Sequence, residues 1–137
     1  MTLPGPKPTA VVVDDSLTAR KMLRSILEEA GFDVLAEGEQ GDQAIMLYEQ
    51  HRPSLITLDI IMPILDGITA AAAILRRHPE AVVVMCSSMS AREKILACRE
   101  LGVKHFILKP MVPEAAVKVV QSVIEQARAH GKAEVSP

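Results

Sequence analysis

Five short apolar runs rich in β-branched residues alternate along this chain with segments whose apolar residues recur every three or four positions. The runs are typical of buried strands, and the periodic segments are typical of amphipathic helices. Strands are expected at 9–15, 32–38, 54–58, 81–88 and 103–110. Helices are expected at 17–30, about 42–51, 67–77, 90–101 and 113–129. Asp15 or Ser16 would cap the first helix, and Ser90 would cap the fourth.

Strict alternation of this kind, with short connections, predicts an α/β fold in which helices cover both faces of a parallel sheet. The doubly wound strand order 2-1-3-4-5 is expected, with the chain reversing its direction of travel between the first and third strands. A hydrophobic content of 49% suits one domain with a substantial core, which is expected at 9–129. A proline-rich leader at 1–8 and a tail at 130–137 are expected to be disordered.

Composition excludes several classes of protein. A net charge of -2 argues against a surface for nucleic acid or an anionic membrane, and 2% aromatic residues offer no stacking platform for bases. Cys86 and Cys98 stand in apolar contexts, which favours buried, reduced thiols. The 4 histidines are dispersed and are expected at the surface rather than at a metal site. No secretory signal and no apolar run of about 18 residues is visible, so a soluble cytoplasmic protein is expected.

Polar residues end the predicted strands at one edge of the sheet. Asp14 and Asp15 end the first strand, and Asp59 ends the third within ITLDIIMPILDG. Ser87 lies at the end of the fourth strand, and Lys109 at the end of the fifth. Because the carboxyl ends of parallel strands meet at one edge, these side chains are expected to gather in the crevice between the first and third strands. A lone carboxylate at the end of a buried strand is costly to desolvate, which indicates a charged site.

Three clustered carboxylates repel one another, and a hard cation such as Mg²⁺ relieves that repulsion through oxygen ligands. The ammonium of Lys109 suits phosphate oxygens, and the hydroxyl of Ser87 can donate to them. A metal, a lysine and a hydroxyl around one carboxylate can move a phosphoryl group onto that carboxylate. Asp59 stands alone on the central strand and is the candidate nucleophile. Asp14 and Asp15 are adjacent and are candidate metal ligands.

With these residues in place, the chain resembles the receiver domains of response regulators, and most of all the stand-alone chemotaxis type. The resemblance runs from about Thr9 to Ala129. It rests on the acids of VVVDDS, the D-x-x-M-P-x-x-D-G motif around Asp59, the serine of MCSS and the Lys-Pro pair of FILKP. Each motif is weak alone, but together and in this order they are specific. The resemblance implies a flavodoxin-like (βα)5 fold.

The resemblance also implies a role for each acid. Asp59 would accept a phosphoryl group from a histidine kinase. Asp15 and Asp59 would bind Mg²⁺ directly, Asp14 would act largely through water, and the backbone carbonyl of Ile61 would complete the protein ligands.

For the remaining residues the resemblance implies a phosphate-dependent switch. Ser87 would hydrogen-bond to the phosphoryl group, and Lys109 would pair with it. Phe106 falls at the position of the family's switch aromatic, which turns inward as Ser87 moves. A cis peptide bond would join Lys109 to Pro110.

Output would leave by protein contact, through the face of the fourth helix, fifth strand and fifth helix. The resemblance makes a flagellar motor switch protein the first candidate partner, and a phosphate sink or relay between kinases the alternative. The chain is expected to be a monomer and not an enzyme beyond assisting its own phosphotransfer and dephosphorylation; dimerisation on activation stays open. A haloacid-dehalogenase-type phosphatase would want an acid where Ile61 stands. A flavodoxin would need a glycine-rich and hydroxyl-rich loop where DDSLTAR stands.

Three apolar residues near the site carry further expectations. Ile61 and Met89 lie two residues after Asp59 and Ser87, where family members often place polar groups that align the hydrolysing water. We therefore expect slow self-dephosphorylation. Cys86 precedes Ser87 and is expected to point away from the site by strand alternation.

Overall fold

The structure is a computed structural model that describes residues 5–88 and 92–129. Within these residues, five parallel strands form one sheet in the order β2-β1-β3-β4-β5. The strands are β1 (Thr9–Val13), β2 (Asp33–Gly38), β3 (Leu55–Asp59), β4 (Val83–Ser88) and β5 (His105–Lys109). The predicted doubly wound order is confirmed.

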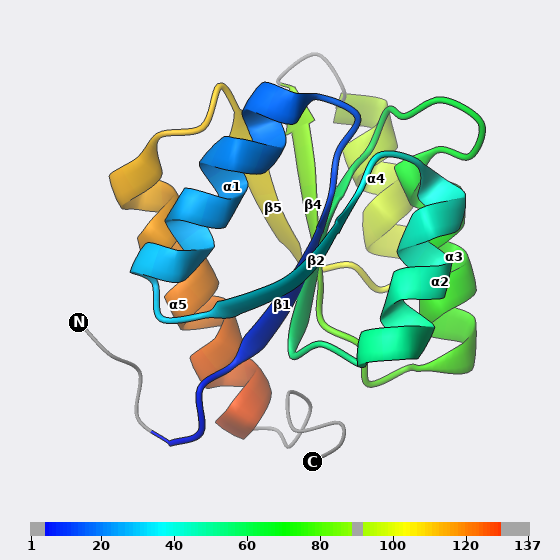
Figure 1. Ribbon diagram of the computed structural model, residues 1–137. Coiled ribbons are helices and arrows are strands. Elements are labelled where there is room, and N and C mark those ends of the chain that lie inside the picture. Colours follow the sequence, from blue (N-terminus) through cyan, green and yellow to red (C-terminus); the bar gives the residue numbers. More distant parts are fainter. Residues whose placement is uncertain (1–4, 89–91, 130–137) are drawn as a thin grey trace.

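Helices cover both faces of the sheet (Figure 1). They are α1 (Leu17–Glu29), α2 (Gly41–His51), α3 (Gly67–Arg77), α4 (Arg92–Glu100) and α5 (Pro113–Ala129). One face carries α1 and α5, and the other carries α2, α3 and α4. Because β1 lies between β2 and β3, connections leave β1 in both directions, and the carboxyl ends of β1 and β3 lie side by side at the switch point.

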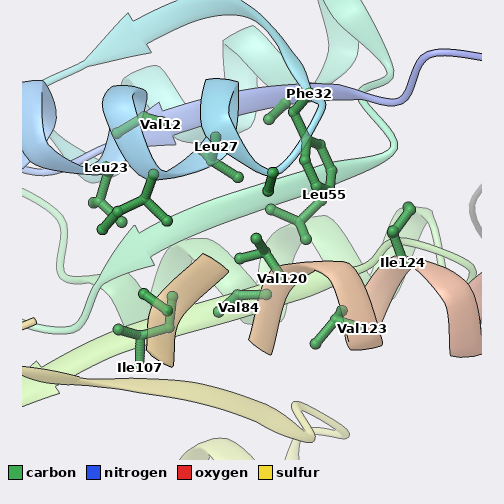
Figure 2. Close-up of a cluster of buried hydrophobic side chains, with 14 of the residues drawn as sticks. Val12, Leu23, Leu27, Phe32, Leu55, Val84, Ile107, Val120, Val123 and Ile124 are labelled. Atoms are coloured by element: carbon green, nitrogen blue, oxygen red, sulfur yellow. The ribbon is translucent and has the colours of Figure 1, made fainter. Parts of the chain in front are cut away.

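Two apolar clusters, one on each face, explain why the central strands β1, β3 and β4 are mainly apolar. Val11 and Val13 of β1 belong to the cluster under α2, α3 and α4, whereas Val12 between them belongs to the cluster under α1 and α5. Figure 2 shows the latter cluster, which includes Val120, Val123 and Ile124 of α5 together with Val84 of β4. Successive strand residues point to opposite faces, so a strand that is covered on both faces has no solvated position.

Local signals in the sequence fix several helix ends. Ser16, one of the two residues expected to cap α1, accepts the N–H three residues on at 3.2 Å. Asp66 caps α3 in the same way at 2.8 Å. Gly31 and Gly102 follow α1 and α4 with φ of +101° and +103°, values that favour glycine. The predicted cap Ser90 and its neighbour Met89 lie outside the described residues.

The expectation of surface histidines is wrong for His78. Its side chain is buried, its Nε2 lies 2.5 Å from Oε2 of Glu49, and its ring packs against Tyr48 at a centroid distance of 5.1 Å. The domain boundaries at 8/9 and 129/130 stay predictions, although the Pro8 carbonyl accepts the N–H of Asp33 at 2.8 Å. Across residues 5–88 and 92–129, no helix is long and apolar enough to cross a membrane.

Candidate functional site

Four strands deliver polar groups to the edge of the sheet at the switch point. Asp14 directly follows β1, and its N–H donates to the Gly38 carbonyl of β2 at 3.0 Å. Asp59 is the last residue of β3, and Lys109 is the last residue of β5. Val13 and Leu58 are register partners, so the two acids that follow them stand side by side on adjacent strands. The structure thus brings together the predicted acids and lysine from distant parts of the sequence.

Asp14 is fully buried and fully engaged. Its Oδ1 accepts the Ser16 N–H at 2.9 Å, and its Oδ2 accepts a hydrogen bond from the Lys109 ammonium at 2.7 Å. A buried carboxylate is stable in folded protein only when such donors replace its lost water. Asp14 is therefore held in one position in the floor of the site.

Asp59 is less tightly bound than Asp14. Its Oδ2 lies 3.5 Å from the Lys109 ammonium, and the residue is 9% exposed. Burial and the charges of Asp14 and Asp15 raise its pKa to about 6, although Lys109 and a backbone hydrogen bond from Ile61 act in the opposite direction. At neutral pH, Asp59 is ionised and incompletely solvated, as a nucleophile should be.

Lys109 is the counter-charge for both buried acids. Burial by itself lowers the pKa of its ammonium, but the hydrogen bond and charge of Asp14, together with the charge of Asp59, outweigh burial and leave that pKa above its usual value. The lysine is therefore fully protonated at neutral pH. The peptide bond between Lys109 and Pro110 is cis.

The three acids suit a hard cation. One carboxylate oxygen from each of Asp14, Asp15 and Asp59 lies within 4.8 Å of the others. Two of these acids are buried and Asp15 is exposed, so the carboxylate cluster reaches the surface at Asp15. Mg²⁺ prefers such a site because it takes a few carboxylates and keeps several waters. Ile61 lies in the loop beyond β3 with its side chain 58% exposed, and its carbonyl as a ligand stays a prediction.

Ser87 is buried, and its hydroxyl donates to the adjacent Ser88 carbonyl at 3.0 Å. A contact between this hydroxyl and a group on Asp59 would require the hydroxyl to leave that carbonyl. The predicted role of Ser87 therefore stays a prediction that involves a conformational change.

Cys86 was expected to point away from the site, and this expectation is wrong. Alternation does place it opposite to Ser87, but Cys86 is the register partner of Asp59 on the neighbouring strand, so both side chains lie on the same face of the sheet. The thiol is fully buried in the cluster beneath the site. Burial raises its pKa to about 12, with the charges of Lys109, Asp14 and Asp59 also acting on it. Cys86 is thus a protonated, apolar part of the floor.

Phe106 lies on β5, half-buried against the cluster under α2, α3 and α4. The Arg99 guanidinium of α4 lies over its ring, 5.8 Å from the centroid. This distance is within the range of a cation–π contact. Whether the ring moves inward on activation stays a prediction.

The sequence did not reveal the structural roles of two residues that shape the site. A Cβ on Gly67 would lie 2.0 Å from the Asp59 carbonyl oxygen, so only glycine lets the start of α3 approach β3 this closely. Arg20 of α1 is 8% exposed and donates to the Asp14 carbonyl at 2.7 Å. Gly67 could have been found from the Asp-Gly pair that begins α3, whereas Arg20 has the same helical spacing as any polar surface residue.

Fold and site together define a doubly wound α/β domain with a cluster of three acids and a lysine beside them at its switch point. Residues 10–121 match the response regulator receiver domain family. The chain belongs to this family, whose members are phospho-accepting signalling proteins, and the match gives no support to a haloacid-dehalogenase-type phosphatase.

Individual relatives agree with this assignment. The chemotaxis protein CheY of Bacillus subtilis (strain 168) is 37% identical over 114 residues, which cover 83% of this chain and 95% of the relative. Protein CcdB of the same organism is 40% identical over 114 residues, with the same coverage of 83% and 95%. Among solved structures, the CheX-CheY-BeF3-Mg complex of Borrelia burgdorferi contains a chain that is 32% identical, with a TM-score of 0.79 over 84% of this chain and 87% of that one.

Proposed function

We propose that this protein accepts a phosphoryl group on Asp59 from a phosphohistidine of a histidine kinase, in a Mg²⁺-dependent reaction. In this step a carboxylate oxygen of Asp59 bonds to phosphorus while the phosphorus–nitrogen bond breaks, and the leaving imidazole keeps the electron pair. The observation that carries the proposal is the Lys109 ammonium placed 2.7 Å from Asp14 and 3.5 Å from Asp59.

Each residue at the site has a task in this chemistry. Asp59, with a pKa of about 6, is ionised at neutral pH and supplies the attacking oxygen. Lys109 can follow the incoming phosphoryl group because its ammonium already lies between the two acids, and Ser87 can donate to the same group. Asp14, Asp15 and Asp59, with the Ile61 carbonyl, would hold the cation. When bound, Mg²⁺ supplies positive charge that offsets the phosphoryl oxygens.

The output we propose is phosphorylation-dependent protein binding, within the cytoplasm and in chemotaxis. The relative in Bacillus subtilis is named a chemotaxis protein, which supports this pathway. The α4–β5–α5 face offers apolar contacts. Leu96 of α4 and Leu108 of β5 are 56% and 49% exposed, and Phe106 of β5 is half-buried. A flagellar motor switch protein is the proposed target, and a phosphate sink or relay between kinases is the alternative.

Phosphotransfer from each purified histidine kinase of the same cell tests the proposal. Transfer should require Mg²⁺, should be abolished by Asp59→Asn, and should survive the matched control Asp33→Asn, which removes an exposed carboxylate on β2. Fast transfer from a chemotaxis kinase supports the chemotaxis output. Transfer from another kinase alone supports the sink or relay. Transfer that persists in Asp59→Asn overturns the assignment of the acceptor.

We also propose that the phosphorylated protein dephosphorylates slowly, because the exposed aliphatic side chain of Ile61 offers no polar group to align water. Ile61→Asn should shorten the half-life of the phosphoryl group, measured on purified protein after the kinase is removed. A half-life of seconds in the unsubstituted protein would contradict this proposal.

A further inference from the structure

Arg20 is a buried cation with three partners. Its side chain extends from α1 towards the carboxyl ends of β1 and β2, and the residue is only 8% exposed. One guanidinium nitrogen donates to the Asp14 carbonyl at 2.7 Å. The other two lie 3.3 Å from Glu37 and 3.6 Å from Glu39. Burying a guanidinium is costly unless its donors are used, so this arrangement constrains the groups that it joins.

The bond to the carbonyl acts on two acids at once. The Asp14 carbonyl belongs to the planar peptide that joins Asp14 to Asp15. The Cα atoms of Asp14 and Asp15 both lie in the plane of this peptide. A donor that holds its carbonyl therefore restrains the starting points of both aspartate side chains. The Asp14 N–H is already bound to Gly38, and its carboxylate is bound to Ser16 and Lys109. Arg20 completes the restraint of the acid pair relative to Asp59.

The charge of Arg20 does not act freely on the pocket. A bare guanidinium so close to a cation site would oppose Mg²⁺. Glu37 and Glu39 offset it, and Arg24 in turn lies 2.6 Å from Glu37. Arg24 also pairs with Glu28, so the cluster holds two arginines and three glutamates and has a net charge of -1. Because the positive charge of Arg20 is offset within its own cluster, we attribute the effect of Arg20 on a bound cation mainly to geometry.

We propose that Arg20 is a positioning residue for the magnesium site, acting through its hydrogen bond to the carbonyl between Asp14 and Asp15. The proposal rests on the Mg²⁺ binding included in the proposed function. In this proposal, the salt bridges between α1 and the end of β2 support the metal ligands. Other metal sites likewise use groups that do not touch the metal but hydrogen-bond to its ligands and orient them.

Arg20→Lys tests the proposal and leaves the net charge unchanged. One ammonium cannot reach the Asp14 carbonyl and both glutamates at once, so the substitution should loosen the hydrogen bond to the carbonyl. Arg24→Lys is the matched control: Arg24 also pairs with Glu37 but has Glu28 as its other partner and makes no bond to Asp14. The Kd for Mg²⁺ is measured by titration calorimetry, and the free energy of unfolding is measured in EDTA. Arg20→Lys should raise the Kd about tenfold. Arg24→Lys should change it by no more than about twofold, because the substitution keeps the charge and Arg24 makes no bond to Asp14.

Arg20→Met separates geometry from charge. Loss of the positive charge alone would tighten Mg²⁺ binding, so weaker binding in both Arg20 variants is expected only if the hydrogen bond matters. An unchanged Kd in both variants overturns the proposal. So does a Kd that rises equally in Arg24→Lys at equal loss of stability, because the effect is then general destabilisation. Absence of Mg²⁺ binding by the unsubstituted protein would instead overturn the magnesium step of the proposed function.

Discussion

Asp59→Asn should stabilise the folded protein at neutral pH, although it removes the residue proposed to carry the phosphoryl group. The site holds the Asp59 carboxylate away from water and next to Asp14. Its pKa of about 6, against an ordinary value of 3.8, means that ionised Asp59 is less favourable in the folded state than in the unfolded state. Asparagine has the same shape and no charge, so the substitution removes this cost.

The magnitude and the sign follow from proton linkage. A pKa of about 6 instead of 3.8 corresponds to about 2 to 3 kcal/mol at pH 7, at about 1.4 kcal/mol for each tenfold change in proton affinity. Because the folded-state pKa is raised, the folded state binds more protons between about pH 4 and pH 6. Stability from this group is present below about pH 4 and is lost as the pH rises through about 6. The gap between variant and unsubstituted protein should therefore open across this window.

Urea unfolding in EDTA between pH 4 and pH 7.5 measures the gap without Mg²⁺ binding to the acids. Asp33→Asn is the matched control, and it should change the free energy of unfolding little at any pH because Asp33 is exposed. A gap that is absent at pH 7, or equally large at pH 4, would refute the reasoning that burial of a charged Asp59 destabilises the fold.

Three further predictions concern packing and charge around the site. Gly67→Ala should lower the free energy of unfolding by more than about 2 kcal/mol in urea, because its Cβ would lie 2.0 Å from the Asp59 carbonyl oxygen. Gly102→Ala, with a φ of +103° but open space around it, should cost about 1 kcal/mol, and an equal loss in both would contradict the steric argument. Lys109→Gln should destabilise the protein in EDTA by about 3 kcal/mol, because it removes the positive charge that pairs with the buried Asp14. The same substitution should tighten Mg²⁺ binding in calorimetry. Unchanged stability would show that Asp14 does not need the lysine. Ser16→Ala should cost about 1 kcal/mol in thermal unfolding through loss of the α1 cap, and no loss would show that Asp15 or water replaces it.

The sequence by itself determined the sheet and the location of the site. Strand and helix periodicities depend on which positions are buried, and burial correlates with residue type. The five apolar runs, and Ser16 as one of two candidate caps of α1, could therefore be identified from local sequence. Asp14, Asp59 and Lys109 were predicted to meet because the ends of parallel strands converge whatever the side chains between them are.

Only the tertiary structure decided how those groups face one another. Cys86 was expected to point away from the site, but the register between β3 and β4 pairs it with Asp59. Arg20 looks like a surface residue of an amphipathic helix until α1 lies against β1 and β2, where its guanidinium reaches the Asp14 carbonyl. Register and the reach of long side chains depend on how separate elements pack, and neither leaves a periodic signal within a single element. The meeting of these acids and the lysine could therefore be predicted from the sequence, whereas the contacts that hold the acids in position could not.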